Sequence, residues 1–229
     1  VLVCARGGPD AEFLRQQGFE VYTHDMSRSQ NPLSAIATIL TIRRVLLERR
    51  IEGLVCHTSL GALAGRIAGW LAHTPRVVYF VHGLACGPVQ GPLTWQLRYQ
   101  IEKLLAPVTD AVIVMNDYDE RLARKSPLGR TRDCIERIPG MGVDLARFTT
   151  APDPDTPNRL CDELGIGRDQ KLVFCVARVV LEEGVREVIE AAKRLCRSRK
   201  GTDFLLAGTG PVQAGLSRSL RHDGLEEHV

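Results

Sequence analysis

A strand-to-helix elbow at Glu182-Glu183-Gly184 combines a geometry that suits phosphate with side chains that repel it. An apolar strand-like run before the elbow ends at Arg178, and an amphipathic helix follows it. Such elbows often bind phosphate, because the first turn of a helix presents unpaired amide groups. Two carboxylates at this place therefore need an explanation. A structural one is available, since the helix macrodipole favours a carboxylate at a helix N-terminus by about 0.3–1 kcal/mol.

Polar residues and glycines recur where the apolar strand-like runs end. In open parallel sheets, ligands bind outside the carboxyl ends of the strands, where helix N-termini gather. Each residue also has an ordinary interpretation: a lone histidine is often structural, the segment 57–59 could cap the next helix, and the segment 208–211 could be a simple turn. Their shared position favours a binding site. The candidates are His57, Thr58, His82, Gly83, Asn116, Gly140, Arg178, Gly208 and Gly210.

Strand-like runs alternate with helical patterns through most of the chain. The runs are short and rich in β-branched residues, and all but the one at 134–138 lack charge in the middle, which suits strands covered on both faces. The alternation predicts an α/β fold with right-handed crossovers and parallel sheets. The strand-like runs are 1–5, 53–56, 76–81, 111–115, 134–138, 172–177 and 203–208, and the helical patterns cover about 31–50, 60–72, 92–106 and 185–199.

The segment APDPDTPNRL (151–160) divides the chain. Its three prolines within seven residues predict a linker that holds neither a helix nor a central strand. We therefore expect a first Rossmann-like domain at 1–148, a linker at 149–168 and a second domain at 169–229. The second domain has too few strands to bury a core alone, so it is expected to be incomplete. The chain begins with Val inside an apolar run, which predicts truncation at its start as well.

Composition limits the class of protein. The chain has 229 residues, of which 44% are hydrophobic and 25% charged, as in a globular protein, and its net charge of +3 is too small to indicate nucleic-acid binding. Short basic clusters such as Arg43-Arg44 and Arg49-Arg50 suit either a solvated helix face or contact with anionic lipid. Seven cysteines at irregular spacing fit neither a disulfide framework nor a zinc site and favour a reducing cytoplasm. No apolar run is long enough to span a membrane.

The glycine spacing argues against a nicotinamide enzyme. A pyrophosphate fingerprint reads Gly-x-Gly-x-x-Gly. After Gly208 and Gly210, position 213 is Gln, and Gly215 comes two residues late.

Taken together, these residues resemble the retaining glycosyltransferases of family 4, which have the GT-B fold of two Rossmann-like domains facing across a cleft. The similarity covers nearly the whole chain. Members that resemble this chain usually move a sugar from a nucleotide donor to a lipid-linked acceptor during synthesis of bacterial surface polysaccharides. The segments that carry the resemblance are 26–28, 31–33, 57–59, 61, 65–66, 81–83, 102, 109–111, 116–117, 138–140, 142–145, 147–148, 178, 182, 184 and 206–211.

The resemblance implies roles for the candidate residues. The first domain would present the acceptor side and the second would hold the donor, a nucleoside diphosphate sugar in which UDP is the expected nucleotide. His82 would lie beside the transferred sugar, and Gly83 would allow close approach of backbone. Arg178 would bind the diphosphate, while Gly208 and Gly210 would leave space near the donor. No metal or other cofactor is expected. The resemblance also implies peripheral contact with the inner face of the plasma membrane.

Two departures from the family pattern concern activity. The pattern after the arginine ends in Glu-Lys-Gly, and here Glu183 occupies the lysine position. Two unit charges about 5 Å apart interact by roughly 3 kcal/mol at an effective dielectric near 20, so Glu183 is expected to repel a diphosphate. Either Arg186 supplies the missing cation, or the donor is held differently, or activity is impaired. The family's pair of glutamates that reaches the donor sugar would lie beyond Val229, so the chain alone is not expected to be active.

Two other classes of function stay open. One is a non-catalytic binding or scaffold protein that keeps the fold, which the acidic residue at the lysine position favours. The other is a different GT-B enzyme, such as a sugar-nucleotide epimerase or a phosphorylase. Titration with nucleoside diphosphates distinguishes a scaffold protein from a glycosyltransferase. Product analysis distinguishes another GT-B enzyme from a glycosyltransferase.

Overall fold

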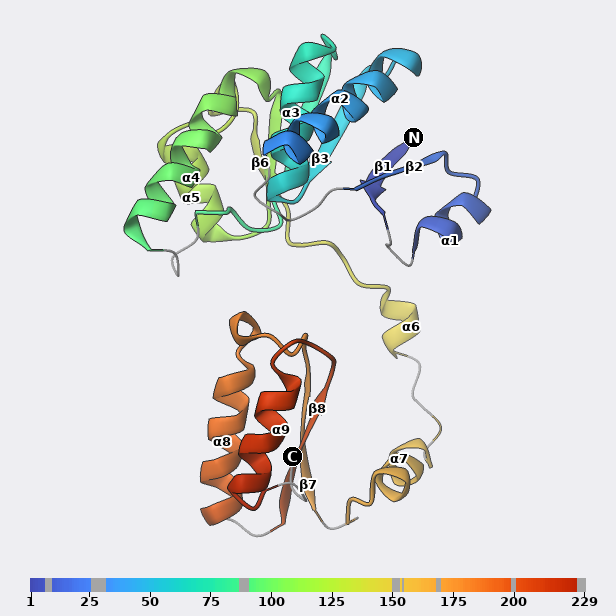
Figure 1. Ribbon diagram of the computed structural model, residues 1–229, viewed down its shortest axis with the longest axis vertical. Coiled ribbons are helices and arrows are strands. Elements are labelled where there is room, and N and C mark those ends of the chain that lie inside the picture. The colour runs from blue at the N-terminus through green and yellow to red at the C-terminus, as the bar shows by residue number, and fades with distance from the viewer. Residues whose placement is uncertain are drawn as a thin grey trace. The chain divides into compact units, whose positions relative to one another are not determined.

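The chain folds into two compact units, Val1–Val143 and Asp144–Val229, which are described separately (Figure 1). The computed structural model describes residues 1–6, 10–25, 32–86, 91–149, 153, 155–167, 170–198 and 201–225. The strands are β1 (Leu2–Ala5), β2 (Val21–His24), β3 (Gly53–His57), β4 (Arg76–Phe80), β5 (Ala111–Val114), β6 (Ile135–Arg137), β7 (Lys171–Val176) and β8 (Thr202–Ala207). The helices are α1 (Asp10–Gln16), α2 (Pro32–Glu48), α3 (Ser59–Leu71), α4 (Pro92–Leu105), α5 (Asp117–Lys125), α6 (Leu145–Thr149), α7 (Thr156–Leu164), α8 (Val185–Ser198) and α9 (Gln213–His222), with short 3-10 turns η1 (Ala106–Val108) and η2 (Leu181–Glu183).

The first unit is built on a parallel four-stranded sheet in the order β3-β4-β5-β6. Helix α3 lies directly on this sheet because two of its glycines face the strands. A Cβ on Gly65 would come within 2.6 Å of the Cys56 Sγ, and one on Gly69 within 3.0 Å of a methyl carbon of Val77. Helix α2 packs in turn on α3. The sequential β-α-β order and the parallel pairing confirm the α/β architecture expected from the sequence.

The core of the first unit lies between this sheet and its helices. The buried residues come from β3 to β6, from α3 and α5, and from the loops after β4 and α5. They are Cys56, Ala62, Val77, Tyr79, Val81, Leu84, Cys86, Val112, Val114, Ala123, Leu128 and Ile135.

The amino-terminal segment departs from the expected single sheet. Residues 1–5 do form a strand, but β1 pairs with β2 in a separate parallel two-stranded sheet, with Leu2 opposite Val21. The pattern analysis found neither α1 nor β2. The reason is that α1 has seven residues of which only Ala11 is buried, so it carries no apolar stripe.

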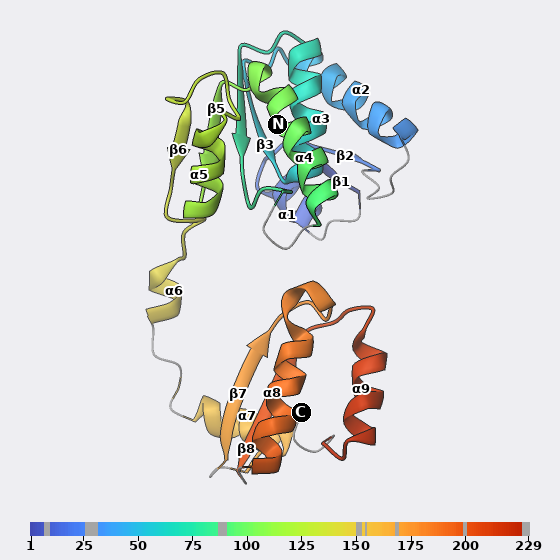
Figure 2. The same ribbon diagram turned by 90° about the vertical axis from the view of Figure 1, so that its left-hand side faces the viewer.

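The second unit contains a parallel pair, β7–β8, with Lys171 opposite Thr202 and Val176 opposite Ala207. Helices α8 and α9 lie on the same side of this pair (Figures 1 and 2). They join through a small core of Ile189, Leu220 and Leu225.

The expectation of a helix-free linker is wrong for residues 156–160, because α7 begins at Thr156. Pro157 stands in the first turn, where its missing N–H would have had no partner within the helix. Gly165, at φ 69°, ends the helix in the left-handed conformation. Proline clustering thus marked the start of a helix here.

Two features bear on the class of protein. All seven cysteines are free thiols. Among the described residues, no helix combines the length and the apolar character needed to cross a membrane.

Candidate functional site at the strand ends

Two histidines predicted from separate strand ends are in contact. His57 is the last residue of β3, and His82 follows β4, which is the neighbouring strand. The Nδ1 of His57 lies 2.9 Å from the Nε2 of His82, so one of the two nitrogens carries a hydrogen and donates a hydrogen bond to the other. Because strands β3 and β4 are parallel, their carboxyl ends lie at the same sheet edge, as the sequence pattern predicted, and this brings the two rings together.

A third aromatic ring, that of Phe80, packs against both histidines. Phe80 stands opposite His57 in the sheet register, and its ring stacks on His57 with centroids 5.0 Å apart. It also lies 5.1 Å from the ring of His82. Partial burial, and then the neighbouring His82, hold the pKa of His57 below its ordinary value. The two histidines are therefore a fixed pair in which His57 favours its neutral form, suited to exchanging hydrogen bonds with a polar ligand.

The turn after His82 is held by helix α5. Gly83 has φ 134°, in the region that favours glycine, and the next residue, Leu84, is buried. The Leu84 N–H donates to the buried carboxylate of Asp119, at 3.3 Å from Oδ2. Asn116 caps α5 by accepting from the Asp119 N–H at 2.8 Å and donates its amide to Asp119 Oδ2 at 2.7 Å. The polar atoms of Asn116 thus have a structural use in fixing the turn that carries His82.

Thr58 and Gly140 occupy unusual backbone conformations. Thr58 precedes α3 with φ 62°, a costly value for a β-branched residue, and its side chain makes no capping hydrogen bond. Thr58 thus stands at the N-cap position of α3, within the segment 57–59 that could cap the helix, but its side chain contributes no cap. Gly140 follows β6 with φ 145°, and a Cβ there would meet nothing within 4 Å. Gly140 is needed for its backbone conformation, with open space beside it.

Arg178 is anchored at the end of β7 by its neighbours. The Ala177 N–H donates to the carbonyl of Ala207 at 3.1 Å, and the Val179 N–H donates to that of Thr209 at 3.0 Å. Val179 is buried while the Arg178 side chain is 65% exposed. The backbone is thus tied to β8 and its loop on both sides of an arginine that points into solvent.

Gly208 and Gly210 are required by close contact between two strand ends. A Cβ on Gly208 would stand 1.9 Å from the carbonyl oxygen of Ala177, and one on Gly210 would stand 2.1 Å from that of Val179. Both obstacles are backbone atoms, which side-chain rotation does not move. The glycines therefore let the loop after β8 lie against the backbone on either side of Arg178.

A depression continues from this loop along α9. Its lining includes Gly210, Gln213, Ser217 and Arg218. The guanidinium of Arg218 donates through Nε to the carbonyl of Ala214 at 3.3 Å. This depression extends the candidate site of the second unit beyond the strand ends.

Glu183 contacts Arg178 directly. Its Oε1 accepts hydrogen bonds from Arg178 Nε at 3.1 Å and from Nη2. The sequence pattern indicated that Glu183 lies near the same phosphate site but not that it forms an ion pair with Arg178. Arg186, the cation proposed to replace the lysine, is exposed on the first turn of α8, and no ion pair joins it to another residue in the described ranges.

The structure thus sorts the candidates into two sets, one in each unit. Sequence reasoning missed Phe80, Asp119 and Arg218. The spacing Asn-x-x-Asp at 116–119 was a readable signal, since an N-cap often pairs with an acidic residue three positions on. Within the described ranges, no group of three or more His, Cys, Asp or Glu residues is arranged to hold a metal ion. The first set is His57, Thr58, His82, Gly83, Asn116 and Gly140, and the second is Arg178, Glu183, Gly208 and Gly210.

Parallel strands in alternation with helices in both units, with glycines, histidines and an arginine at the strand ends, define an α/β protein with Rossmann-like units. The Glycosyl transferase 4-like domain family matches residues 1–140, more than half of the sequence. The chain belongs to this family.

Two relatives extend the similarity over nearly the whole chain. EpsD of Bacillus subtilis (strain 168), a candidate glycosyltransferase, is 26% identical over 241 residues, which cover 96% of this chain and 62% of EpsD. An Escherichia coli protein named UDP-Gal:alpha-D-GlcNAc-diphosphoundecaprenol alpha-1,3-galactosyltransferase is 24% identical and is matched over 97% of this chain and 57% of its own length. The chain therefore spans about three fifths of the curated relatives it matches.

Solved structures confirm the fold. A glycosyltransferase from Rickettsia africae superposes with a TM-score of 0.68 at 13% identity, over 99% of this chain and 58% of that one. Epimerases that act on UDP-N-acetylglucosamine share the same architecture. The predicted GT-B class with Rossmann-like units and parallel sheets is thus confirmed, and the shared fold by itself does not separate transferases from epimerases.

Proposed function

We propose that this chain is part of a retaining glycosyltransferase that moves a sugar from a nucleoside diphosphate sugar to a lipid-linked saccharide in the synthesis of a surface polysaccharide. The observation that carries the proposal is the exposed Arg178 guanidinium at the end of β7, beside the glycine loop, in a chain of this family. The relative from Escherichia coli is named for a UDP-sugar donor and a diphosphoundecaprenol acceptor, which supports the same substrate classes here.

The proposed chemistry explains why an arginine is needed at the end of β7. Transfer breaks the bond between the sugar and the diphosphate, so negative charge grows on the leaving nucleotide in the transition state. A guanidinium presents several N–H donors in one plane and keeps its charge, which suits two phosphate oxygens. In our proposal Arg178 binds the diphosphate of UDP, and side-chain cations stabilise it without a resident metal ion.

The histidine pair has a proposed role toward the sugar. His82 is held by His57 on one side and by the turn that Asp119 fixes on the other. A ring held in this way loses little freedom when it binds, which favours a defined hydrogen bond to a sugar hydroxyl or phosphate oxygen. We assign His82 to that contact and His57 to its support.

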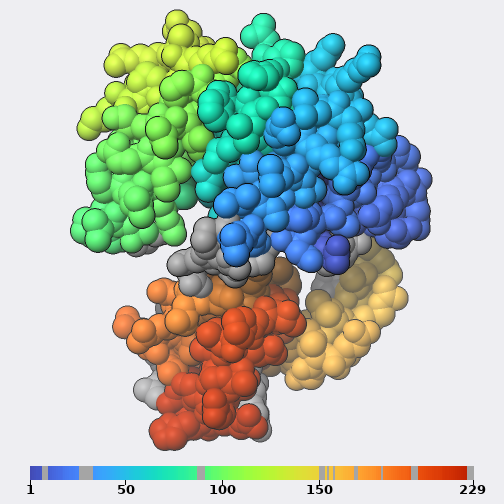
Figure 3. All heavy atoms as spheres, turned by 45° about the horizontal axis from the view of Figure 1, so that its top comes forward, coloured from blue at the N-terminus to red at the C-terminus, as the bar shows by residue number. Residues whose placement is uncertain are grey.

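Contact with the inner membrane face is also part of the proposal. Helix α4 carries three exposed leucines on one side, Leu93, Leu97 and Leu104, with 83%, 62% and 78% of each accessible. Figure 3 shows atoms of α2 and α4 at the surface of the first unit. By contrast, Arg44 and Arg49 of the basic clusters pair with Glu48 and Glu20, which fits a solvated face. The apolar face of α4 is therefore the better candidate for reaching a lipid-linked acceptor at a cytoplasmic membrane surface.

Product analysis tests the proposal. A longer protein that contains this chain is incubated with radiolabelled UDP-sugars, with and without an undecaprenyl-diphosphate-linked saccharide, and the products are separated and examined by NMR. The proposal predicts a longer lipid-linked saccharide whose new linkage has the anomeric configuration of the donor, and no product without acceptor. Conversion of the UDP-sugar to its epimer without acceptor would support an epimerase instead. Absence of both nucleoside diphosphate binding and turnover in that longer protein would support the scaffold alternative.

A further inference from the structure

The ion pair between Arg178 and Glu183 occupies one edge of the guanidinium. Both Nε and Nη2 of Arg178 donate to the same oxygen of Glu183, Oε1. A guanidinium offers five N–H groups, and the edge formed by Nε and Nη2 is one of the two that bind an oxyanion through parallel hydrogen bonds. A diphosphate and Glu183 would therefore use the same kind of contact on the same cation.

The backbone brings the two residues together. Arg178 is fixed by the bonds of Ala177 and Val179 to β8 and the loop that follows it. The chain then turns through η2, in which the Glu183 N–H donates to the carbonyl of Val180 at 3.3 Å. Gly184, at φ 76°, reverses the chain into α8. The short turn therefore places the carboxylate of Glu183 beside Arg178 without a long flexible connection.

The net charge of Arg178 and Glu183 together determines how strongly this place attracts an anion. The Arg178 and Glu183 side chains together carry no net charge, whereas Arg178 alone carries one positive charge. The side chains are 65% and 38% exposed, so water and salt weaken the ion pair and its exchange for another anion is easy. A diphosphate then binds a cation that is already partly neutralised.

We propose that Glu183 acts as a built-in counter-ion of Arg178, which competes with the donor diphosphate and lowers the affinity for it. This inference rests on the proposed function and assigns an affinity-setting role to Glu183. It also explains the two carboxylates at an elbow that suits phosphate: one of them neutralises the arginine there while no ligand is bound. A product diphosphate is held less firmly for the same reason.

Calorimetric titration of the chain with UDP tests the inference. The central variant is Glu183→Gln, which keeps the size of the side chain and removes its charge. The matched control is Glu187→Gln, which makes the same charge change on the first turns of α8, at an exposed residue that no ion pair joins to Arg178 among the described residues. Each change is also made in an Arg178→Gln background to form a double-mutant cycle.

We expect Glu183→Gln to bind UDP roughly three- to tenfold more tightly than the parent chain, and Glu187→Gln to differ from it by less than about twofold. In the Arg178→Gln background, the gain from Glu183→Gln should disappear. Equal affinity of Glu183→Gln and the parent chain, weaker binding by Glu183→Gln, or a gain that persists without Arg178 would overturn the counter-ion role. The absence of UDP binding in every variant and in the parent would instead overturn the proposed function, and this inference with it.

Discussion

His57 Nδ1 stands 2.9 Å from His82 Nε2, and this contact joins the ends of two adjacent parallel strands. Its main consequence is that Nδ1 of His57 has a ring nitrogen of His82 as its hydrogen-bond partner. The pKa of His57 is lowered first by partial burial and then by the nearby His82. We therefore expect the protonation of this pair, and with it the stability of the first unit, to depend on pH.

The first prediction concerns this titration. NMR of the chain labelled in its histidine rings should show that His57 titrates below the usual 6.5 of an isolated histidine. Replacing His82 by Asn should raise the pKa of His57 part of the way back, because burial, the larger cause, remains. A pKa of His57 at or above 6.5 in the parent chain would be inconsistent with the contact.

The lowered pKa of His57 also determines how the free energy of unfolding changes with pH. Since the folded state holds His57 below its unfolded pKa, the unfolded chain binds more protons near that value. The stabilising contribution is full above about pH 6.5 and is lost as the pH falls through 6.5 toward the folded pKa. Urea denaturation at pH 7.5, 6.5 and 5.5 should show this loss, and the loss should be smaller in His57→Asn.

A second prediction concerns the glycines beside Arg178. Replacing Gly208 or Gly210 by Ala forces a Cβ against a backbone carbonyl at about 2 Å, so the loop after β8 must move. We expect each change to destabilise the second unit by about 2–4 kcal/mol, as overpacking and backbone strain do. Gly215→Ala is the control, because α9 has open space there and alanine favours helix by about 1 kcal/mol. Unchanged unfolding of Gly208→Ala would contradict the close contact.

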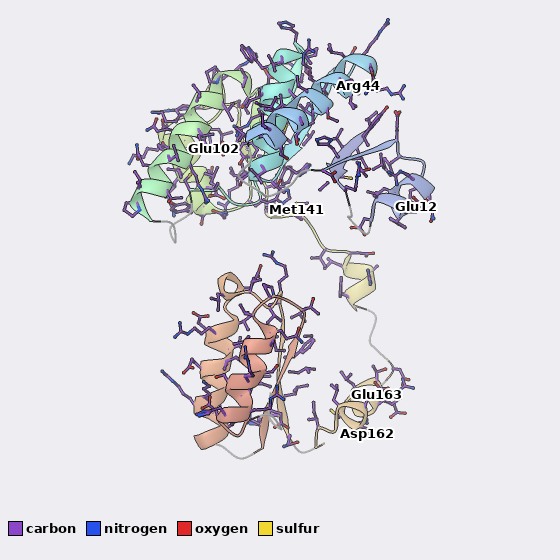
Figure 4. All side chains as sticks on the ribbon, in the orientation of Figure 1. Glu12, Arg44, Glu102, Met141, Asp162 and Glu163 are labelled. Carbon is purple, nitrogen blue, oxygen red and sulfur yellow. The ribbon has the colours of Figure 1, made fainter. Side chains whose placement is uncertain are left out.

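A third prediction concerns the buried ion pair behind the sheet. Arg66 of α3 is fully buried, and its Nη2 donates to Glu102 of α4 at 2.6 Å while its Cζ lies 4.2 Å from the centre of the Tyr79 ring. Glu102 is labelled in Figure 4. Glu102→Gln leaves the Arg66 charge buried without its partner, which should cost about 3–5 kcal/mol in the free energy of unfolding.

The control for that pair is an exposed one. Glu48→Gln breaks the ion pair of Arg44 on the surface of α2 and should change the free energy of unfolding by less than about 1 kcal/mol. Arg44 is also labelled in Figure 4. Urea titrations that give equal costs for Glu102→Gln and Glu48→Gln would show that the buried pair does not hold α3 and α4 to the sheet.

A fourth prediction concerns the turn that carries His82. Asp119→Ala removes the acceptor of the Leu84 N–H and the partner of Asn116, and should cost about 1–3 kcal/mol because a buried donor loses its bond. It should also broaden or shift the ring signals of His82. Asp117→Ala, which removes an exposed ion pair with Arg137 from the same helix turn, is the control and should leave the His82 signals in place.

The positions of the site residues followed from the sequence because strand ends are readable in an α/β chain. An apolar run indicates the strand, and the polar residue after it marks the carboxyl end, so the sequence indicated that His57 and His82 share one sheet edge but did not predict their direct contact. Arg178 and the glycine loop were found by the same reasoning. The periodic helices α2, α3, α4 and α8 were predicted for a similar reason, since each carries apolar residues at helical spacing.

What the sequence did not show depends on three-dimensional contact. The pairing of Glu183 with Arg178 depends on the direction in which a short turn carries one carboxylate. Gly208 and Gly210 were expected to leave space for a ligand, whereas the structure shows that they allow one backbone to approach another. Helix α7 begins within a segment whose prolines predicted a helix-free linker, because the first turn of a helix accepts proline.

The central claim is that a nucleoside diphosphate binds the second unit at Arg178 and the glycine loop. Amide NMR of the chain titrated with UDP tests it directly, with Arg178→Gln as the variant and Arg194→Gln, an exposed arginine further along α8, as the matched control. We predict that UDP shifts the amides of residues 177–184 and 208–211, that Arg178→Gln weakens binding by about tenfold or more, and that Arg194→Gln leaves it nearly unchanged. UDP-induced shifts confined to other residues, or equal affinity in the Arg178→Gln variant, would contradict the account.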